Sequence, residues 1–166
     1  KIKETKKVFL KDASVIIWTT TPWTIPANKA LAFNKNIEYS VLEISDLNYF
    51  KDKKIVVANN LIKSITQACG IESYKVLKTF KGSDFIGTIC SHPFIKMNFD
   101  YDVPMLDAQF VNLEQGTGIV HCAPSHGPDD FNLCLNNGIK AIETVDGDGK
   151  YTDYVKLFNG IHIFKA

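Results

Sequence analysis

The feature that most constrains the fold of this chain is a series of short runs rich in Val, Ile, Phe, Tyr and Thr, separated by residues that favour turns. β-branched and aromatic side chains fit the pleated surface of a sheet. Every run is also far shorter than the ~20 apolar residues that a membrane-spanning helix needs. The runs therefore predict strands at residues 14–20, 37–44, 54–58, 74–80, 103–111, 119–122 and 161–164.

Two segments instead show helical spacing of apolar residues. One predicted helix begins at Asn59 or Asn60, either of which can cap it, and ends at Gly70. The other begins at Gly127 and ends at Gly138. Because strands outnumber helices and are unevenly spaced, we expect a mainly β fold with flanking helices (α+β), built on a closed or strongly curved, mainly antiparallel sheet. The length of 166 residues is typical of a single domain, residues 1–166.

Charge excludes several classes of function. The chain has 19 basic and 18 acidic residues, a net charge of +1, and no arginine. Nothing therefore attracts it strongly to nucleic acid or to an anionic membrane, and phosphate contacts must use lysine, backbone amides and hydroxyls.

The N-terminus lacks the apolar core of a signal peptide, and the four cysteines form no CxxC pair. We expect a soluble, cytoplasmic protein with reduced, mostly buried thiols and no membrane partner.

The segment WTTTPWTIPAN, residues 18–28, concentrates hydroxyl groups where a strand ends. Its two prolines cannot donate to a sheet, so the chain must leave the sheet near Thr21. Thr20, Thr21 and Thr24 are then candidates to point their hydroxyls into a pocket, where they suit a water molecule, an ester carbonyl or a ribose hydroxyl. The alternative is that the threonines only favour a strand and the prolines only mark a turn.

The segment GTGIVHCAPSHGPDD, residues 116–130, joins a strand to a helix. Gly116 and Gly118 permit a tight turn or a close backbone approach, and the third glycine of a dinucleotide site is missing. The strand carries His121 to its end. Asp130 falls in the first helical turn, where the helix dipole favours a charged carboxylate that could bind an ammonium group. The alternative for Asp130 is a helix-capping acid.

Two other chemistries are less favoured in the same segment. His121, Cys122 and His126 could approach one metal ion, but no fourth ligand stands at a familiar spacing, so we predict no metal. Ser125 and His126 could suggest a serine hydrolase, but the GxSxG motif is absent and adjacent side chains seldom turn toward each other.

Two further sequence features have structural explanations. Residues 146–149, DGDG, look like the start of a calcium loop, but the twelfth position is Leu157 instead of Glu. A hairpin turn is the simpler interpretation. His92 and His162 lie in apolar segments, where packed structural histidines are more common than ligands.

Together, WTTTPWTIPAN, GTGIVHCAPSHGPDD and the closing DGKYT and NGIHIF resemble, in order and separation, the editing domain of isoleucyl-tRNA synthetases. That domain is an insertion in a class I catalytic core. Thr21 favours the isoleucyl branch, since valyl and leucyl relatives carry Arg there. Cys122 and Ser125 depart from the family's HTAPGHG. The HIGH and KMSKS signatures are absent, so the resemblance implies a domain excised from a larger enzyme, which does not itself activate isoleucine with ATP.

The resemblance implies a fold, that of a closed antiparallel β-barrel, and a site. The implied catalytic residues are Thr20, Thr21, His121 and Asp130, and the implied substrate-binding residues are Thr19, Thr24, Asn28, His121, Ala123, His126 and Asp130. Within this set Asp130 holds the α-ammonium group, His121 gauges side-chain size, and the threonine strip with Asn28 binds the terminal adenosine and positions water. Trp23 is expected to pack beneath the strip.

The resemblance also implies a reason for the activity. A hydrophobic pocket gains only about 1–3 kcal/mol per methylene, a limit of which isoleucyl-tRNA synthetases are a standard example. A synthesis site for isoleucine therefore accepts valine too often. A second pocket that admits valine and excludes isoleucine corrects this error. The expected substrates are the acceptor end of tRNA(Ile) carrying valine, and valyl-adenylate. The expected mechanism uses a positioned water, no covalent intermediate and no cofactor, with His121 or His126 open as general base.

The other expected partner is the rest of the parent synthetase, which ligates isoleucine to tRNA(Ile) using ATP, and the chain is expected to be a monomer. The alternative function is a non-catalytic module that binds the tRNA acceptor end.

Overall fold

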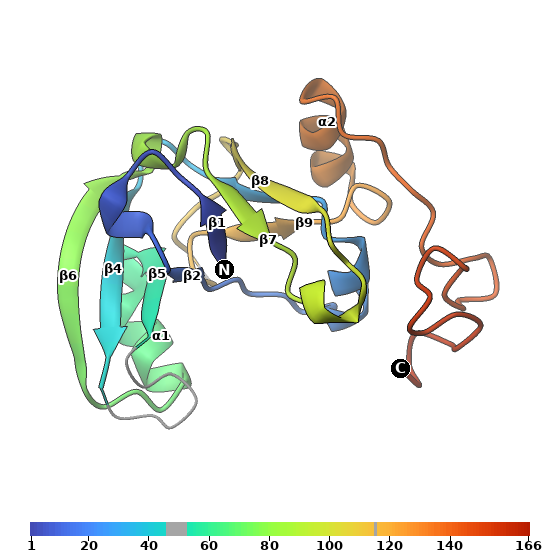
Figure 1. Ribbon diagram of the computed structural model, residues 1–166, viewed down its shortest axis with the longest axis horizontal. Helices are drawn as coiled ribbons and strands as arrows, with labels where there is room; N and C mark the ends of the chain where they lie inside the picture. The colour runs from blue at the N-terminus through green and yellow to red at the C-terminus, as the bar shows by residue number, and fades with distance from the viewer. Residues whose placement is uncertain (46–52, 115) are drawn as a thin grey trace.

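The computed structural model describes residues 1–45, 53–114 and 116–166, which form two β-sheets with short helices around them (Figure 1). The strands are β1 (Ile2–Glu4), β2 (Ser14–Val15), β3 (Ala30–Phe33), β4 (Glu38–Ile44), β5 (Lys54–Ala58), β6 (Tyr74–Lys81), β7 (Ile89–Ser91), β8 (Asp102–Asp107) and β9 (Val120–Cys122). The α-helices are α1 (Ile62–Ala68) and α2 (Pro128–Asn136). Short 3-10 helices are η1 (Val8–Leu10), η2 (Pro22–Ala27), η3 (Asn59–Leu61), η4 (Gly82–Phe85) and η5 (Ile95–Met97). None of the helices in these ranges is long and apolar enough to cross a membrane.

One sheet has the strand order β1-β7-β8-β3-β9 and the other β2-β5-β4-β6. Most neighbours are antiparallel, and the β3–β8 and β2–β5 pairs are parallel. Neither sheet closes on itself within the described ranges, so the expected closed barrel is wrong. The physical reason lies in residues 14–20, which were predicted to form one long strand. They pair with β5 over two residues and touch β9 through a single bridge at Trp18 before the prolines of η2 turn the chain away.

The main core lies between the two sheets. Phe33, Tyr39, Phe80 and Phe85 pack there with ring centroids 4.9–6.1 Å apart. The Tyr39 hydroxyl donates a 2.8 Å hydrogen bond to the carbonyl of Gly118, which ties the core to the loop before β9.

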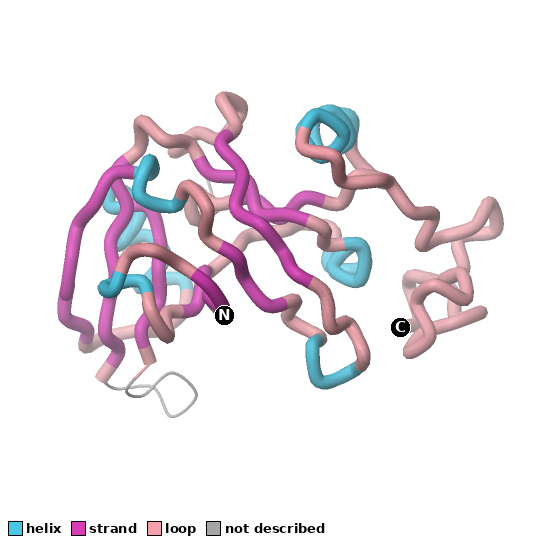
Figure 2. The backbone as a smooth tube through the Cα atoms, turned by 45° about the horizontal axis from the view of Figure 1, so that its top comes forward, coloured by secondary structure: helices cyan, strands magenta, loops and turns pink. Residues whose placement is uncertain are grey.

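Strand β3 is buried on both faces. Leu31 and Phe33 face the main core, whereas Ala30 and Ala32 pack with Cys122 and α2 on the other face. In Figure 2 helix α2 covers this end of the five-stranded sheet. The free thiols of Cys90, Cys122 and Cys134 are buried and that of Cys69 is exposed, as predicted for reduced and mostly buried cysteines.

The predicted strands at 37–44, 54–58, 74–80 and 119–122 are confirmed to within one residue at each end. The strand predicted at 103–111 ends at Asp107. Residues 161–164 form turns with a single bridge from His162 to Lys150, so that strand is wrong. Strands β1, β3 and β7 were not predicted. They have three or four residues each, too few to show an alternating pattern, and β3 has none because both of its faces are buried.

The three helix ends marked by glycine are confirmed. Gly127 is the N-cap of α2, and Gly138 and Gly70 follow their helices with φ of +72° and +65°. The predicted asparagine cap is wrong, because Asn59 begins η3 and α1 starts later without a side-chain cap. The Asn59 side chain instead accepts a 2.7 Å hydrogen bond from the Ser40 hydroxyl.

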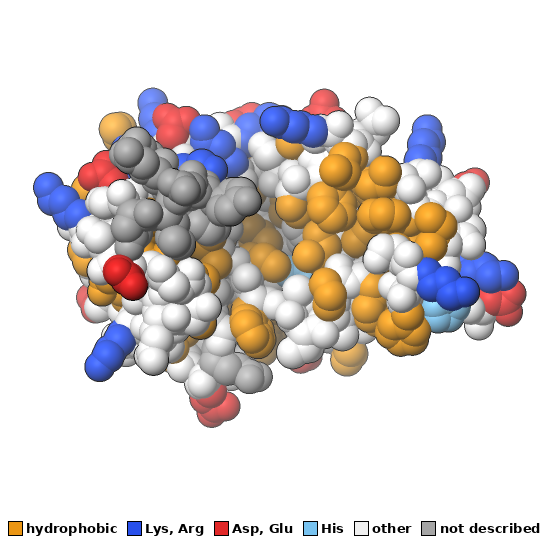
Figure 3. All heavy atoms as spheres, turned by 90° about the horizontal axis from the view of Figure 1, so that it is seen from below, with side chains coloured by type: hydrophobic (Ala, Val, Ile, Leu, Met, Phe, Trp, Pro, Cys, Tyr) orange, Lys and Arg blue, Asp and Glu red, His pale blue; other side chains and the backbone are white. Residues whose placement is uncertain are grey.

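Residues 139–166 form a C-terminal segment of turns beside the sheets (Figure 1). Asp146 begins a hairpin in which its carboxylate accepts backbone N–H groups of Asp148 and Lys150, as predicted for residues 146–149. Exposed hydrophobic side chains gather over η5 and this segment (Figure 3), which carry Ile95, Met97, Leu157, Ile161 and Phe164.

Candidate functional site

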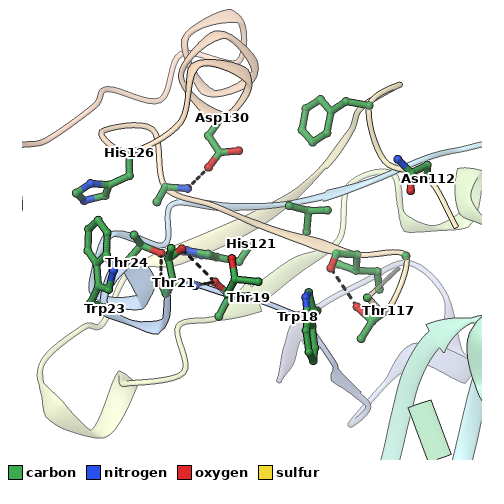
Figure 4. A pocket seen from close by; sticks show the side chains of 17 residues that line it. Trp18, Thr19, Thr21, Trp23, Thr24, Asn112, Thr117, His121, His126 and Asp130 are labelled. Atoms are coloured by element: carbon green, nitrogen blue, oxygen red, sulfur yellow. Dashed lines mark hydrogen bonds between the residues drawn. The ribbon is translucent and has the colours of Figure 1, made fainter. Parts of the chain in front are cut away.

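The two motif segments meet at one pocket of about 380 Å³, a size typical of small-molecule sites (Figure 4). The predicted residues that line it are Thr19, Thr20, Thr21 and Thr24 from the first segment and His121, Ala123, His126 and Asp130 from the second. Trp18 and Trp23 complete the wall on the threonine side. The structure thus brings together side chains that are about a hundred residues apart in the chain.

The threonine strip takes its shape from hydrogen bonds made where the chain leaves the sheet. The backbone N–H of Thr21 donates to the Thr19 hydroxyl at 3.1 Å, and η2 then begins at Pro22. The Thr24 hydroxyl lies within hydrogen-bond distance of two acceptors for its proton, the Thr21 carbonyl at 2.8 Å and His121 Nε2 at 2.9 Å. Thr24 is buried, while Thr20 and Thr21 are exposed to the pocket. The strip therefore offers neutral donors and acceptors on a fixed turn.

His121 is held at both ring nitrogens. Its Nε2 lies 2.9 Å from the Thr24 hydroxyl oxygen, and its Nδ1 lies 3.0 Å from the side-chain oxygen of Asn28. Burial, together with smaller effects of the neighbouring His92 and His126, lowers the pKa of His121 to about 4. The ring is therefore neutral at neutral pH and rigidly oriented. Because both nitrogens are engaged by the protein, His121 suits a wall better than a general base.

Asn28 does not line the pocket, contrary to the prediction. It is buried and borders a second, smaller cavity together with His121. Its backbone carbonyl accepts a 3.0 Å hydrogen bond from the Tyr101 hydroxyl. Asn28 therefore orients His121 and does not face a ligand in the pocket.

Asp130 is the one carboxylate among the described residues that line the pocket. Its Oδ2 accepts the backbone N–H of Ala123 at 2.9 Å, so it bonds to the loop after β9 rather than capping α2 at Gly127 (Figure 4). Burial raises the pKa of Asp130, and the Ala123 hydrogen bond opposes that rise. Burial thus acts against the charged form of Asp130 that a position in the first helical turn favours. A half-buried carboxylate among neutral groups is stabilised when a cation binds beside it.

His126 stands at the edge of the pocket and is fixed from the C-terminal segment. Its Nε2 lies 2.8 Å from the Thr144 hydroxyl, and its ring meets Trp23 edge-on with centroids 5.1 Å apart. Burial lowers the pKa of His126. The neighbouring Ser125 hydroxyl donates to the carbonyl of Ile142, so Ser125 and His126 do not form the hydrolase pair considered above.

The metal alternative also fails on geometry. Across the described ranges, no three or more His, Cys, Asp or Glu side chains are placed to hold a metal ion. Cys122 packs with the alanines of β3, on the opposite face of β9 from His121. His92 is structural, as predicted: it donates from Nε2 to the Ile25 carbonyl, accepts the Phe94 N–H at Nδ1, and stacks on Phe99.

Sequence reasoning missed several lining residues, among them Phe110, Asn112 and Thr117. Thr117 stands between two glycines of positive φ, Gly116 at +79° and Gly118 at +73°. A Cβ on Gly118 would lie 2.4 Å from the Ala58 Cβ, which confirms the close approach predicted there. The glycine pair was the available signal for Thr117, whereas Phe110 and Asn112 follow β8 in a loop without a motif.

Comparisons with known proteins agree with this fold. No protein-family model matches the chain. It is 65% identical over 165 residues to isoleucine–tRNA ligase of Pelagibacter ubique and 44% identical over 161 residues to that of Gluconobacter oxydans. These matches cover 99% and 95% of the chain, which spans only 18% and 17% of the two relatives.

Solved structures with the same fold are editing domains of leucyl-tRNA synthetases. A Plasmodium falciparum cytosolic domain has a TM-score of 0.60 at 18% identity, over 84% of this chain and 58% of that one. The domain named GlLeuRS-CP1 has a TM-score of 0.58 at 19% identity, over 77% and 50%. The chain is therefore homologous, over nearly its whole length, to a segment of isoleucine–tRNA ligases, and it has the fold of the synthetase editing domain.

Proposed function

We propose that this chain hydrolyses the ester that joins valine to mischarged tRNA(Ile), as a module of an isoleucine–tRNA ligase. Three observations support the proposal: the homology to these ligases, the editing-domain fold, and a pocket with one carboxylate among neutral hydroxyl groups. In this proposal Asp130 binds the α-ammonium group of the substrate. The hydroxyls of Thr19, Thr20 and Thr21 hold the ribose of the terminal adenosine and a water molecule.

The size limit of the proposed pocket comes from His121. A neutral ring bound at both nitrogens resists displacement, so it excludes a larger side chain by steric contact. Valine fits against the ring, whereas the extra methylene of isoleucine collides with it. We expect His121→Ala to raise the hydrolysis of isoleucyl-tRNA(Ile), and an unchanged rate on that substrate would remove His121 from this role.

In the proposed reaction, water attacks the ester carbonyl, the bond from the carbonyl carbon to the ribose oxygen breaks, and a proton passes to that oxygen. Hydroxyls of the threonine strip donate hydrogen bonds to the developing oxyanion. Orientation of water and ester supplies much of the acceleration. His126 or a ribose hydroxyl of the substrate assists the proton transfer, because His121 has no free nitrogen. Valyl-adenylate is proposed as a second substrate of the same pocket.

The observation that carries the proposal is the single pocket shared by the threonine strip and Asp130. The test is hydrolysis of valyl-tRNA(Ile) and isoleucyl-tRNA(Ile) by the 166-residue chain at high protein concentration, since its net charge of +1 predicts weak tRNA binding. We expect release of valine and little release of isoleucine. Binding of tRNA without hydrolysis of either ester would instead support a non-catalytic module that binds the acceptor end.

A further inference from the structure

The His121 ring separates two spaces. The pocket lies on one side, with Thr24 at Nε2 among its lining residues. A second cavity of about 80 Å³ lies on the other side, with Asn28 at Nδ1 among its lining residues. Apolar side chains from β2, β3 and β7, including Val15, Leu31 and Cys90, form much of the rest of this cavity. The wall of the pocket is thus backed partly by empty space.

Leu31 is the cross-strand neighbour of His121 that shares the small cavity with it. It stands directly opposite His121 in the antiparallel pairing of β3 with β9, and directly opposed residues project on the same face of a sheet. Leu31 is 6% exposed and lines the small cavity, but it does not line the pocket. Its side chain therefore supports the ring without reaching a ligand.

A wall that excludes one methylene must not yield when a larger side chain presses on it. Protein interiors resist such displacement because they are closely packed. A void behind the ring removes part of that resistance, so what remains depends on the two hydrogen bonds and on the side chains that limit the void. The size of the void then governs how far the ring can retreat.

From this arrangement, and resting on the proposed function, we infer that Leu31 is a specificity-determining positioning residue: by limiting the cavity behind His121, it sets how strictly the pocket excludes substrates larger than valine. Enlarging the cavity lets the ring retreat and admits isoleucine. Filling the cavity holds the ring in place.

The test compares Leu31→Ala and Leu31→Val with Leu42→Ala and Leu42→Val. Leu42 is fully buried in β4, in a different core cluster, and lines neither space, so its variants reproduce the chemical change and the loss of stability without touching the wall. The measured quantity is the ratio of kcat/KM for valyl-tRNA(Ile) to that for isoleucyl-tRNA(Ile). Because one methylene is worth 10–200-fold in such a pocket, we expect Leu31→Ala to lower the ratio by about tenfold or more and Leu31→Val by less.

A variant that fills the cavity provides the opposite test. Cys90 is 2% exposed and lines the cavity from β7, so Cys90→Val adds a methyl group there. Added to Leu31→Ala, it should restore part of the lost ratio, an effect that a general loss of stability does not produce. If Leu31→Ala does not fold, the kcat/KM ratio of Leu31→Val alone tests the inference. A ratio unchanged in both Leu31 variants, or lowered as much by the Leu42 variants, would overturn the inference.

A binding measurement separates this inference from the proposed function. The probes are adenosine analogues that carry valine or isoleucine through a stable amide at the ribose. If the unaltered chain hydrolyses neither ester, the hydrolytic proposal fails, while the ratio of the two dissociation constants still reports on the wall. We expect that ratio to fall in Leu31→Ala and to stay constant in Leu42→Ala, and a constant ratio in both would overturn the role of Leu31.

Discussion

The hydroxyl of Tyr151 donates a 2.8 Å hydrogen bond to the backbone carbonyl of Trp23, 128 residues earlier in the chain. Tyr151 is buried in a cluster with Phe99 and Val155, and Trp23, which packs against this cluster, lines the pocket. The same segment binds His126 through Thr144. Two sides of the pocket are therefore held by residues that follow the last helix.

This link predicts the effect of Tyr151→Phe, which removes one hydrogen bond and leaves the ring. We expect the free energy of unfolding to fall by about 1 kcal/mol, because a neutral hydrogen bond contributes roughly that much. We also expect KM for valyl-tRNA(Ile) to rise as the Trp23 turn loosens. Denaturant unfolding and steady-state kinetics measure the two effects. Tyr74→Phe, on the exposed edge strand β6, is the matched control and should change neither.

The anchor role of Asp130 predicts that Asp130→Asn lowers kcat/KM for valyl-tRNA(Ile) by about a hundredfold or more. Loss of a partly buried charge pair costs on the order of 2–5 kcal/mol, which sets that scale. The control is Asp129→Asn, since Asp129 is adjacent, acidic and exposed, and lies outside the pocket. Equal activity in the two variants would show that the α-ammonium group binds elsewhere.

Two buried histidines predict how stability depends on pH. Burial lowers the pKa values of His92 and His121 from 6.5 to about 4, so between these values the unfolded chain binds more protons than the folded one. Stability is therefore complete above pH 6.5, falls as the pH drops toward 4, and levels off below it. At ~1.36 kcal/mol per pKa unit, each histidine accounts for roughly 3 kcal/mol. The raised pKa of Asp130 has the opposite effect on stability, because there the folded chain binds the proton more tightly than the unfolded one.

The variant His92→Gln tests this origin of the pH dependence, because it removes one of the two titrating groups while leaving the pocket residues in place. We expect lower stability at pH 7 and a slope between pH 6.5 and 4 reduced by about half. Thermal or denaturant unfolding at several pH values measures it. A slope equal to that of the unaltered chain would assign the dependence to other groups.

The close approach at Gly118 predicts a large cost for Gly118→Ala. The new Cβ would sit 2.4 Å from the Ala58 Cβ at a φ of +73°, so we expect a loss of at least about 2–3 kcal/mol from steric overlap and backbone strain together. Gly138→Ala is the control, because its φ is +72° and nothing lies within 4 Å of its Cβ, leaving only a strain of about 1–2 kcal/mol. Adding Ala58→Gly should recover stability in the first variant only. Additive effects of the two changes would contradict the predicted overlap.

The sequence predicted which segments meet at the pocket more closely than it predicted the closure of the sheet. Hydroxyls beside prolines, and an acid in the first helical turn, have local physical causes that do not depend on the rest of the chain. Glycines beyond a helix act equally locally, which is why both ends of α2 were correct. These signals located most of the pocket, including Thr20, Thr21 and Asp130.

The features that were wrong depend on contacts between distant segments. Closure of a barrel depends on how far strand edges pair, and residues 14–20 pair with β5 at only two positions and with β9 through one bridge. The local sequence around Asn28, and likewise that around Asp130, does not indicate whether the side chain is buried or open to a pocket. Their actual environments, behind His121 and against the Ala123 amide, arise from the pairing of β3 with β9 and from the packing of α2. No pattern within a few residues contains that information.

The hydrogen bond between Thr24 and His121 joins positions 97 residues apart. During synthesis the ribosome adds Thr24 long before His121, so a partial product that ends before His121 cannot form this contact. Such a product lacks both His121 and Asp130, the two residues through which the proposed function selects and binds its substrate. In a refolding time course, hydrolytic competence should appear in step with the slowest formation of long-range contacts, with no earlier phase of relaxed selectivity.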